Sequence, residues 1–471
     1  MKKTKIVATL GPSVESYDIK RRMVEAGVNV FRINFSHARY EIVREQIEHI
    51  EKIRKETGKH VAVLADLQGP KLRIGNMPAG VELKTGDTFV LTNDDSPGDD
   101  HHASVGYKTL PAEVKPGELI LLDDGKIHLR VKETDGKSRI LTEVLQGGPL
   151  KSHKGLNLPD SEISVPSVTE KDKKDLEFAR QIGVDWIALS FVRSAKDILD
   201  LKAYLSWLND DTPVIAKIEK PEAIRQLEEI MDVADGVMVA RGDLGIEIPI
   251  EQVPLLQKKI VRLAKRKAKP VIIATQMMES MIEQLLPSRA EVNDVANSVI
   301  DGADAVMLSG ETSVGKHPLE VIQRVSSIIR SVEEGVRFSG EKILPSKSDS
   351  RFITKTICFY AAETALDIGA KAITTLTASG YSAAQVASHR PPAHILVFTH
   401  NNRILNRLML YWGIYTFFYD KMVSTDETIR DIINMIKKEN FVSPGDFAIN
   451  LTSMPLTEKG MVNTLRITKI D

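Results

Sequence analysis

The chain has 471 residues and a formal net charge of −1, so two or three domains are expected, and nothing in the charge favours nucleic acid or an anionic membrane as a partner. The only cysteine, Cys358, excludes an intramolecular disulfide and a cysteine-based zinc site and fits a reducing compartment. The basic start runs into Gly11-Pro12 too soon for a signal peptide, and no stretch approaches the roughly 20 apolar residues of a membrane-spanning helix. We therefore expect a soluble, cytoplasmic protein with small ligands.

Short apolar segments of strand length recur along the chain. Eight are strand candidates, at residues 5–10, 30–35, 61–66, 186–191, 213–219, 236–240, 270–274 and 305–309. Amphipathic, helix-like stretches lie between and after them, at residues 16–26, 40–56, 221–234, 250–268, 288–301 and 318–334. This alternation predicts a parallel sheet, and eight units predict an α/β fold of the (β/α)8 TIM barrel type, with an open doubly wound sheet as the alternative.

Two segments depart from the alternation. After the third strand the chain carries short alternating strands separated by Asp-Gly and Gly-Gly turns, which predict an inserted small β-barrel lid domain at the catalytic mouth. After residue 340 a further α/β segment has strand candidates at 372–376, 394–398 and 447–451. The predicted domains are therefore residues 1–69 with 168–340 (the barrel), 70–167 (the lid), and 341–471 (a C-terminal α/β domain for effector binding and oligomerisation).

Polar residues end several of the predicted strands. Alternate residues of a strand share a face, so Arg32, Asn34 and Ser36 lie on one side of the second strand. Glu219 and Asp243 end strands five and six, where barrel enzymes carry catalytic residues. Two carboxylates with room for waters and substrate oxygens describe a Mg²⁺ site better than a Ca²⁺ or Zn²⁺ site. The alternative is a pair of salt-bridged strand-end carboxylates.

Cations surround the same predicted mouth. Arg32, Arg73 and Lys217, together with a divalent metal, are what a phosphorylated, carboxylated substrate requires. Lys217 can stabilise negative charge that develops on a leaving oxygen, and pairing with Glu219 is compatible with that role. Thr275 ends strand seven, where its hydroxyl either passes a proton on through water or only bonds the backbone.

Ten blocks of the sequence carry specific motifs: KIVATLGPSVES, VFRINFSH, ADLQGPKLRIG, KGLNLPDSEISVPSVTEKD, DWIALSFVR, PVIAKIEKPEAI, GVMVARGDLGIEIP, VIIATQMMESM, SRAEVNDVANSVIDGADAVMLSGETSVGKHPLE and TLTASGYSAAQVASHRP. In this order they resemble the pyruvate kinase family along essentially the whole chain. The resemblance implies transfer of the phosphoryl group of phosphoenolpyruvate to ADP, giving pyruvate and ATP in the last step of glycolysis. It implies Mg²⁺ as cofactor, with Mn²⁺ as a substitute, and a homotetramer built through the barrel and the last domain.

Residue roles follow from the resemblance by matching position. The catalytic residues would be Lys217, Arg32 and Thr275, and the substrate contacts Arg32, Lys217, Gly242, Asp243 and Thr275. The nucleotide contacts would be Asn34, Phe35, Ser36, His37, Arg73 and Lys154. The magnesium ligands would be Glu219 and Asp243, and the monovalent-cation site would consist of Asn34, Ser36, Asp66 and the carbonyl of Leu67.

One residue departs from the potassium-dependent members of the family. Those members carry Glu where this chain has Lys71. An ammonium there can fill the position of the monovalent cation, and its charge disfavours a second cation. We therefore predict activity without K⁺. The alternative is that Lys71 points to solvent.

The last domain contains a candidate effector loop. Its hydroxyls and backbone donors suit an anion, and the residues that resemble a sugar-phosphate loop are Thr377, Ser379, Gly380 and Ser382. Ala378 and Tyr381 replace the basic residues often found there. We predict a site for a phosphorylated effector whose identity the sequence leaves open.

Two other functions stay as alternatives. A magnesium-dependent aldolase or lyase acting on pyruvate would use the same barrel and carboxylates, although Arg32, Arg73 and the inserted lid favour a phosphorylated substrate and a nucleotide. A catalytically silent metabolite-binding regulator is disfavoured because Lys217 and Thr275 are intact alongside Arg32 and both carboxylates.

Overall fold

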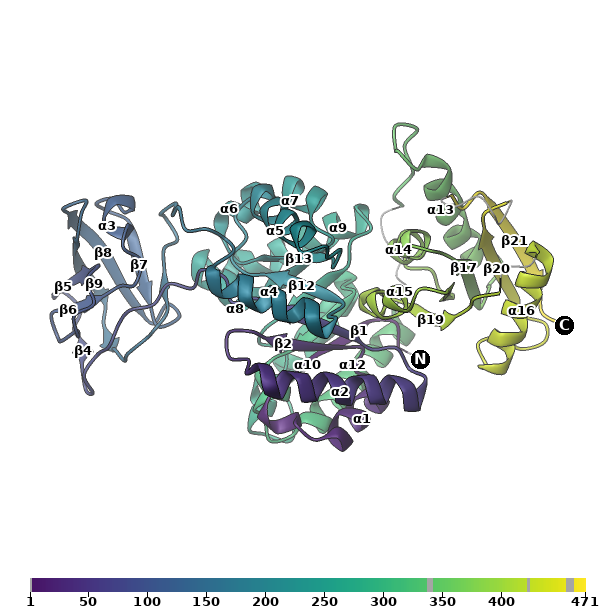
Figure 1. The fold of residues 1–471 in the computed structure, drawn as a ribbon, viewed down its shortest axis with the longest axis horizontal. Coiled ribbons are helices and arrows are strands. Elements are labelled where there is room, and N and C mark those ends of the chain that lie inside the picture. Colours follow the sequence, from purple (N-terminus) through teal and green to yellow (C-terminus); the bar gives the residue numbers. More distant parts are fainter. Residues whose placement is uncertain (1, 337–341, 422–423, 455–460) are drawn as a thin grey trace.

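The computed structural model describes residues 2–336, 342–421, 424–454 and 461–471. The molecule is elongated, with the inserted domain at one end, the barrel in the centre and the C-terminal domain at the other end (Figure 1). None of the helices within these described ranges combines the length and the apolar character that crossing a membrane would need.

The central sheet is a closed barrel of parallel strands, as the sequence predicts, and not an open sheet. Its order is β1-β16-β15-β14-β13-β12-β3-β2. The strands are β1 (Lys5–Thr9), β2 (Val30–Asn34), β3 (Ala62–Asp66), β12 (Trp186–Leu189), β13 (Val214–Ile218), β14 (Gly236–Ala240), β15 (Val271–Ala274) and β16 (Ala305–Leu308). All eight predicted strands are present, each ending within two residues of its predicted bounds.

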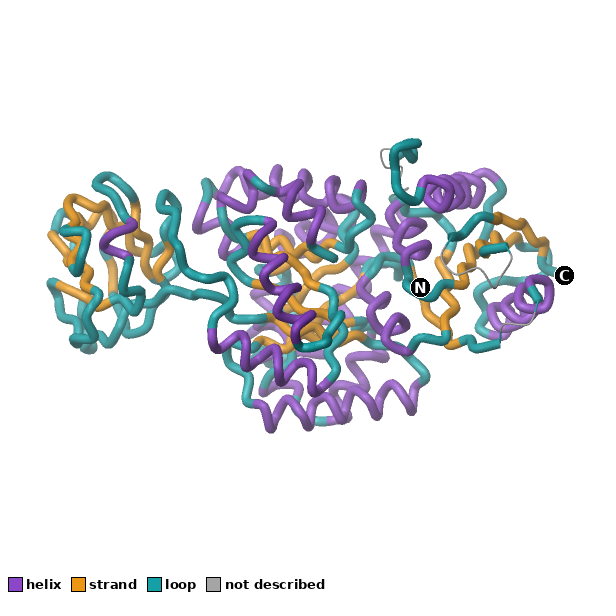
Figure 2. The backbone as a smooth tube through the Cα atoms, turned by 45° about the horizontal axis from the view of Figure 1, so that its top comes forward, coloured by secondary structure: helices purple, strands orange, loops and turns teal. Residues whose placement is uncertain are grey.

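Helices cover the outside of the barrel (Figure 2). They are η1 (Pro12–Val14), α1 (Tyr17–Ala26), α2 (Tyr40–Thr57), α4 (Glu170–Ile182), α5 (Ala195–Trp207), α6 (Pro221–Arg225), α7 (Leu227–Val233), α8 (Arg241–Glu247), η2 (Ile250–Gln252), α9 (Val253–Arg266), η3 (Glu279–Ile282), α10 (Arg289–Asp301), α11 (Gly310–Ser313) and α12 (Pro318–Gly335). Reciprocal side-chain caps begin α4 at Thr169 and α10 at Ser288. The predicted helix over 221–234 is two helices, because the backbone leaves the helical region at Gln226.

The amino end of the barrel is sealed by the C-terminal domain. Inward-facing strand residues such as Val7 and Leu64 form one apolar cluster with Met409 and Leu410. The indole of Trp186 donates a hydrogen bond to the carbonyl of Arg407 at 3.0 Å. This packing covers the amino end of the barrel and leaves the carboxyl ends of the strands, where barrel enzymes place their sites, on the opposite side.

The inserted domain follows β3 and leaves the barrel at its carboxyl end. A six-stranded sheet in the order β11-β7-β8-β9-β5-β6 and a separate pair, β10-β4, share one apolar core, so the sheet curls around its own side chains. The elements are β4 (Glu82–Leu83), β5 (Thr88–Thr92), β6 (His102–Ser104), α3 (Leu110–Glu113), β7 (Leu119–Leu122), β8 (Ile127–Thr134), β9 (Arg139–Gln146), β10 (Gly148–Pro149) and β11 (Leu156–Asn157).

The C-terminal domain is a five-stranded sheet in the order β19-β18-β17-β20-β21, parallel except for β21. Its elements are α13 (Phe352–Asp367), β17 (Ala372–Leu376), α14 (Tyr381–Ser388), β18 (His394–Thr399), α15 (Asn402–Arg407), η4 (Leu408–Leu410), β19 (Ile414–Phe418), α16 (Thr425–Lys438), β20 (Phe447–Thr452) and β21 (Thr464–Lys469). The three predicted strands are confirmed. The two strands that the sequence analysis missed, β19 and β21, are the edges, where one side of the strand is unpaired.

Candidate active site

A cavity of about 180 Å³ opens at the carboxyl end of the barrel, facing the inserted domain. It collects strand-end residues that are far apart in the sequence, as the positions of β2, β3, β12, β13 and β14 require. Its lining residues are Arg32, Asn34, Ser36, His37, Asp66, Leu67, Gln68, Lys71, Arg73, Ser190, Phe191, Lys217 and Asp243.

A network of buried charges forms the floor of this cavity. Arg32 donates through Nε to Asp66 Oδ2 at 2.7 Å and through Nη1 to the hydroxyl of Thr9 at 3.0 Å. Lys217 Nζ lies 3.2 Å from Asp66 Oδ1 and 3.0 Å from Glu219 Oε1. Asp66, expected as a ligand of a monovalent cation, is therefore the residue that orients both cations predicted to act on the substrate.

The pKa directions follow from this pairing. Burial opposes the charged form of Lys217, but the carboxylates of Asp66 and Glu219 raise its pKa above the usual value. Burial likewise opposes the charge on Asp66, yet Lys217 and Arg32 lower its pKa. Burial raises the pKa of Glu219, and the negative charge of Asp243 raises it further, against the opposing effect of Lys217. The ammonium of Lys217 is thus a positive charge held between two carboxylates.

Ser190 is a site residue that the sequence analysis missed. Its hydroxyl accepts a hydrogen bond from Lys217 Nζ at 2.6 Å and donates one to the carbonyl of Leu67 at 2.7 Å. Ser190 comes directly after β12, so the rule that polar residues ending apolar strands face the mouth would have found it.

Glu219 and Asp243 satisfy the chemical requirements of a divalent-cation site. Glu219 follows β13, and Asp243 lies in the first turn of α8, which follows the adjacent strand β14. Among the described residues, His, Cys, Asp and Glu side chains form no group of three or more arranged around a metal. Two carboxylates match Mg²⁺, which keeps several waters and usually takes only one or two protein carboxylates. Burial raises the pKa of Glu219 and the charge of Asp243 adds to this, so a cation bound between them would favour the charged form of both.

Thr275 and Gly242 lie together beside the cavity but are not among its lining residues. Gly242 N–H donates to Thr275 Oγ1 at 2.7 Å, and this hydroxyl donates to the carbonyl of Ala274 at 2.6 Å. Thr275 has φ +69°, an uncommon conformation for a β-branched residue. The guanidinium of Arg241 donates a hydrogen bond to the carbonyl of Thr275 at 2.7 Å. In this arrangement the hydroxyl of Thr275 bonds only backbone groups.

The predicted monovalent-cation ligands line the same cavity as Lys71. Asn34 Oδ1 accepts from the backbone N–H of Ser36 at 3.1 Å, and Leu67 and Asp66 have the partners given above. Lys71 is half-buried, and no described residue forms an ion pair or hydrogen bond with its ammonium. Lys71 and the four predicted ligands thus line one cavity.

The predicted nucleotide contacts divide into two groups. Asn34, Ser36, His37 and Arg73 line the cavity, whereas two other residues have partners elsewhere. The ring of Phe35 is buried and packs edge-on against two aromatic residues, Tyr40 and Phe178. Lys154 pairs with Asp123 of the inserted domain at 2.7 Å.

The predicted effector loop joins β17 to α14. Gly380 adopts φ +81° and donates to the hydroxyl of Thr377 at 3.0 Å. Ser382 is buried and lies 2.8 Å from the hydroxyl of Thr375, so its side chain points into the domain. Of the loop hydroxyls, that of Ser379 is exposed.

Comparison with known proteins gives one family across the chain. Residues 1–322 match the family model described as pyruvate kinase, barrel domain, and residues 355–468 match that described as pyruvate kinase, alpha/beta domain. The chain is 42% identical to the pyruvate kinase of Corynebacterium glutamicum over 467 residues, covering 99% of this chain and 97% of that protein. It is 41% identical to the pyruvate kinase of Mycobacterium tuberculosis over 471 residues, covering 99% and 98%. A crystal structure of a pyruvate kinase from Cryptosporidium parvum superposes with a TM-score of 0.93 at 31% identity, covering 100% of this chain and 96% of that one.

Proposed function

The chain belongs to the pyruvate kinase family of phosphotransferases, and we propose that its site transfers the phosphoryl group of phosphoenolpyruvate to ADP with Mg²⁺ held by Glu219 and Asp243 and without K⁺. The observation that carries this proposal is the buried network in which Asp66 orients both Arg32 and Lys217 at the one open end of the barrel. Two fixed cations beside a carboxylate pair suit an anionic substrate that is held through a divalent metal.

Arg32 is the residue that orients the transferring group. Phosphoryl transfer passes through a loose transition state whose charge is spread over several oxygens, so alignment and electrostatic stabilisation do most of the work. A guanidinium has five N–H donors. Arg32 commits Nε and Nη1 to Asp66 and Thr9, which fixes the plane of its guanidinium while leaving other donors for the phosphoryl oxygens.

Lys217 stabilises the oxygen that leaves phosphorus. Its raised pKa keeps the ammonium charged, and three partners (Asp66, Glu219 and Ser190) hold it in place, so little reorganisation is needed as the enolate forms. When bound, Mg²⁺ supplies further positive charge to the carboxylate and phosphoryl oxygens of the substrate. Pyruvate then forms when the methylene carbon of the enolate takes a proton.

Thr275 is the residue we assign to that proton path. Its strained backbone is the observation in favour, because strain of this kind is concentrated at functional sites. Its bonds to Gly242 and Ala274 would have to exchange for a water on the substrate side. The same bonds also support the alternative that the hydroxyl only shapes the turn after β15.

Independence from K⁺ rests on Lys71. An ammonium carries the same charge as K⁺, and the ammonium of Lys71 has no partner among the described residues, although it lines the cavity with Asn34, Ser36 and Asp66. A second cation beside it would meet like-charge repulsion. Lys71 therefore supplies the charge that K⁺ supplies in potassium-dependent relatives.

The C-terminal domain is proposed to bind a phosphorylated effector and to join subunits into a homotetramer. Ser379 and Thr377 offer hydroxyls at the effector loop. Exposed apolar side chains lie on the barrel at Ile250 and Leu255, and on the last domain at Tyr360, which is the kind of surface that subunits cover. Sedimentation of the purified protein as a monomer would contradict the tetramer.

A coupled assay for pyruvate tests the activity directly. We expect pyruvate to form from phosphoenolpyruvate only when ADP and Mg²⁺ are both present, with chelation abolishing turnover and tetramethylammonium buffer supporting it as well as potassium buffer. Pyruvate release from a substrate without ADP would instead favour the aldolase or lyase alternative, and a stimulation of tenfold or more by K⁺ would contradict the role of Lys71.

A further inference from the structure

Helix α8 carries Gly242 and the cavity-lining Asp243 in its first turn and is only seven residues long. Its beginning is fastened to the barrel: Arg241 pairs with Asp294 at 2.7 Å, and Gly242 N–H donates to Thr275. Seven residues make about two helical turns, so the last residue of α8 lies only about one turn from the turn that carries Asp243. A displacement of the end of the helix therefore also displaces its first turn. What holds the end of α8 therefore bears on the position of Asp243.

The end of α8 is held by a buried carboxylate that joins two domains. Glu247 Oε1 accepts a hydrogen bond from Lys220 Nζ at 2.5 Å and another from the side-chain amide of Asn157 at 2.7 Å. Asn157 belongs to β11 of the inserted domain, whereas Lys220 directly follows Glu219 at the end of β13. The chain Asn157–Glu247–Lys220 thus connects the inserted domain to α8 and to the strand end that carries the other predicted metal ligand.

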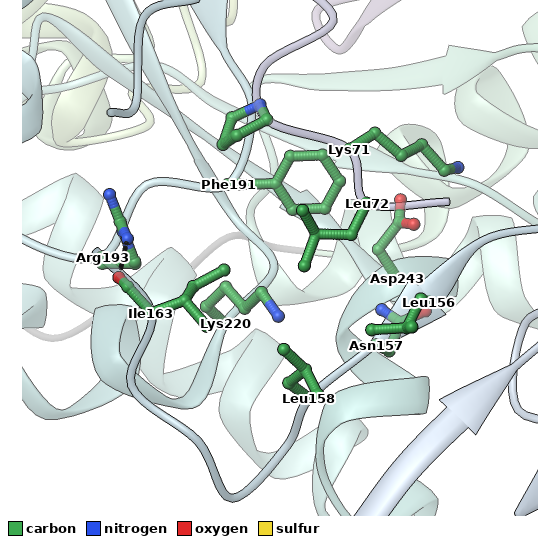
Figure 3. A pocket seen from close by; sticks show the side chains of 11 residues that line it. Lys71, Leu72, Leu156, Asn157, Leu158, Ile163, Phe191, Arg193, Lys220 and Asp243 are labelled. Carbon is green, nitrogen blue, oxygen red and sulfur yellow. Dashed lines mark hydrogen bonds between the residues drawn. The ribbon is translucent and has the colours of Figure 1, made fainter. Parts of the chain in front are cut away.

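Two further features strengthen this connection. Asn157, Lys220 and Asp243 line one cavity between the inserted domain and the barrel, with apolar walls that include Leu158 and Phe191 (Figure 3). Glu247 and Lys220 are buried, and hydrogen bonds in such surroundings are stronger than exposed ones. The inserted domain also lies close to α8 next to Glu247: a Cβ added to Gly125 would come within 3.5 Å of the side chain of Ile246.

We propose that Asn157 and Glu247 are positioning residues that set Asp243 relative to Glu219 according to where the inserted domain lies. With the Asn157–Glu247 bond made, α8 is fastened at both ends and the position of Asp243 relative to Glu219 is fixed. With the bond broken, the end of α8 is released together with the inserted domain. This inference rests on the proposed role of Glu219 and Asp243 as metal ligands.

The test separates movement of the inserted domain from metal affinity. Asn157→Leu removes the amide donor at similar volume, and Glu247→Gln keeps the shape while removing the charge that attracts Lys220. Gln146→Leu is the matched control, because Gln146 donates its amide to Lys126 within the inserted domain and not to the barrel. Spin labels on Lys137→Cys and Lys196→Cys report the distance between the inserted domain and the barrel. Cys358 will not compete for the label, since it is buried and burial raises the pKa of its thiol to about 12.

Three readouts are compared with the wild type: the distribution of label distances, the dissociation constant of Mn²⁺ measured from the signal of the free ion, and kcat against KM for ADP. For Asn157→Leu we expect a broader distance distribution, a higher KM for ADP, and Mn²⁺ binding weakened about tenfold, the low end of what the loss of a hydrogen bond to a charged group implies. The double variant with Glu247→Gln should lose less than the sum of the two single losses, because both residues belong to one hydrogen-bonded chain that ends at Lys220.

Unchanged Mn²⁺ affinity in Asn157→Leu, additive effects in the double variant, or an equal loss in Gln146→Leu would each overturn the proposal. If Asn157→Leu fails to fold by circular dichroism, Asn157→Ala removes the same amide donor and supplies the comparison. Retention of Mn²⁺ binding by Asp243→Asn would refute the metal site itself, and the label distances with KM for ADP would then decide whether the contact positions α8.

Discussion

Replacement of Lys217 by methionine is the sharpest test of the catalytic scheme. In the structure the ammonium lies 3.0 Å from Glu219 and 3.2 Å from Asp66, and both carboxylates are buried. Lys217→Met keeps most of the side-chain volume and leaves Asp66 with Arg32, but leaves Glu219 with only the N–H of Phe191, at 2.7 Å. Removing one preorganised group that stabilises developing negative charge costs about 10²–10³ in kcat, and we expect a loss in that range.

The same change has a stability cost with a defined pH dependence. Removing one partner of a buried ion pair lowers the free energy of unfolding by about 3–5 kcal/mol. The loss is smaller where Glu219 binds a proton and so becomes neutral. The pKa of Glu219 is already raised by burial, and loss of Lys217 raises it further. A group whose pKa is raised on folding favours the folded state at low pH and ceases to do so as the pH rises through the folded value. The melting temperature of Lys217→Met should therefore fall further below that of the wild type as the pH rises from acid to neutral.

The assay has two parts and a matched control. Turnover is followed by coupling pyruvate to lactate dehydrogenase, and deuterium uptake into the methyl group of pyruvate, with ATP and Mg²⁺ present, reports enolate formation alone. Both should fall in Lys217→Met. Lys202→Met removes a more exposed ion pair of similar length, Lys202 with Asp235 at 2.8 Å, outside the active-site cavity, and should keep wild-type turnover. A folded Lys217→Met enzyme with kcat within threefold of the wild type would refute the role of Lys217.

Four further predictions concern other parts of the molecule. Lys71→Glu removes the ammonium from the cavity and should create a K⁺ requirement, seen as a rate at least tenfold higher in potassium than in tetramethylammonium buffer; equal rates in the two buffers would count against it. Thr275→Ala should lower kcat about a hundredfold, the lower end of the range for proton transfer by a positioned side chain, and Thr275→Ser should recover most of the loss; equal activity of the two variants would leave Thr275 with a backbone role only. Lys5 is buried against the C-terminal domain, where burial lowers its pKa to about 7 from 10.5. Because the unfolded chain then binds more protons than the folded chain between these values, wild-type stability should rise with pH across that interval relative to Lys5→Met, and parallel melting profiles would contradict this. Ser379→Asp puts a negative charge on the exposed part of the effector loop and should abolish activation by sugar phosphates, whereas unchanged activation would place the effector elsewhere.

Most of the barrel and its charged floor could be predicted because the signals are local. A buried parallel strand is a short apolar run, and the polar residue that ends it must face the mouth whatever the details of packing. Arg32, Lys217 and Asp243 were found in this way, and all three line the cavity. Ser190 obeys the same rule. The predicted strand over 186–191 includes Ser190, so Ser190 does not stand out as a strand-end residue until β12 is seen to end at Leu189.

Other features depend on partners that no local pattern specifies. The family resemblance predicts that Asp66 is a ligand of a monovalent cation. Asp66 ends β3, which lies between β2 and β12, and in this position it is the shared counter-ion of Arg32 and Lys217. Phe35 lies in a motif of contacts to nucleotide, but its ring turns into the core because aromatic side chains from two helices surround it.

By itself, the sequence determined the eight-stranded barrel, the place of the inserted domain and the chemical types gathered at the mouth, because strand periodicity and the alternation of strands with helices are properties of neighbouring residues. Only the tertiary structure decided which charges pair, how Lys217 is held, and that the inserted domain reaches α8 through Asn157 and Glu247, which are 90 positions apart. The physical reason is that a hydrogen bond or ion pair depends on distances of a few tenths of an ångström, and those distances are set by how whole elements pack, not by any pattern along the chain.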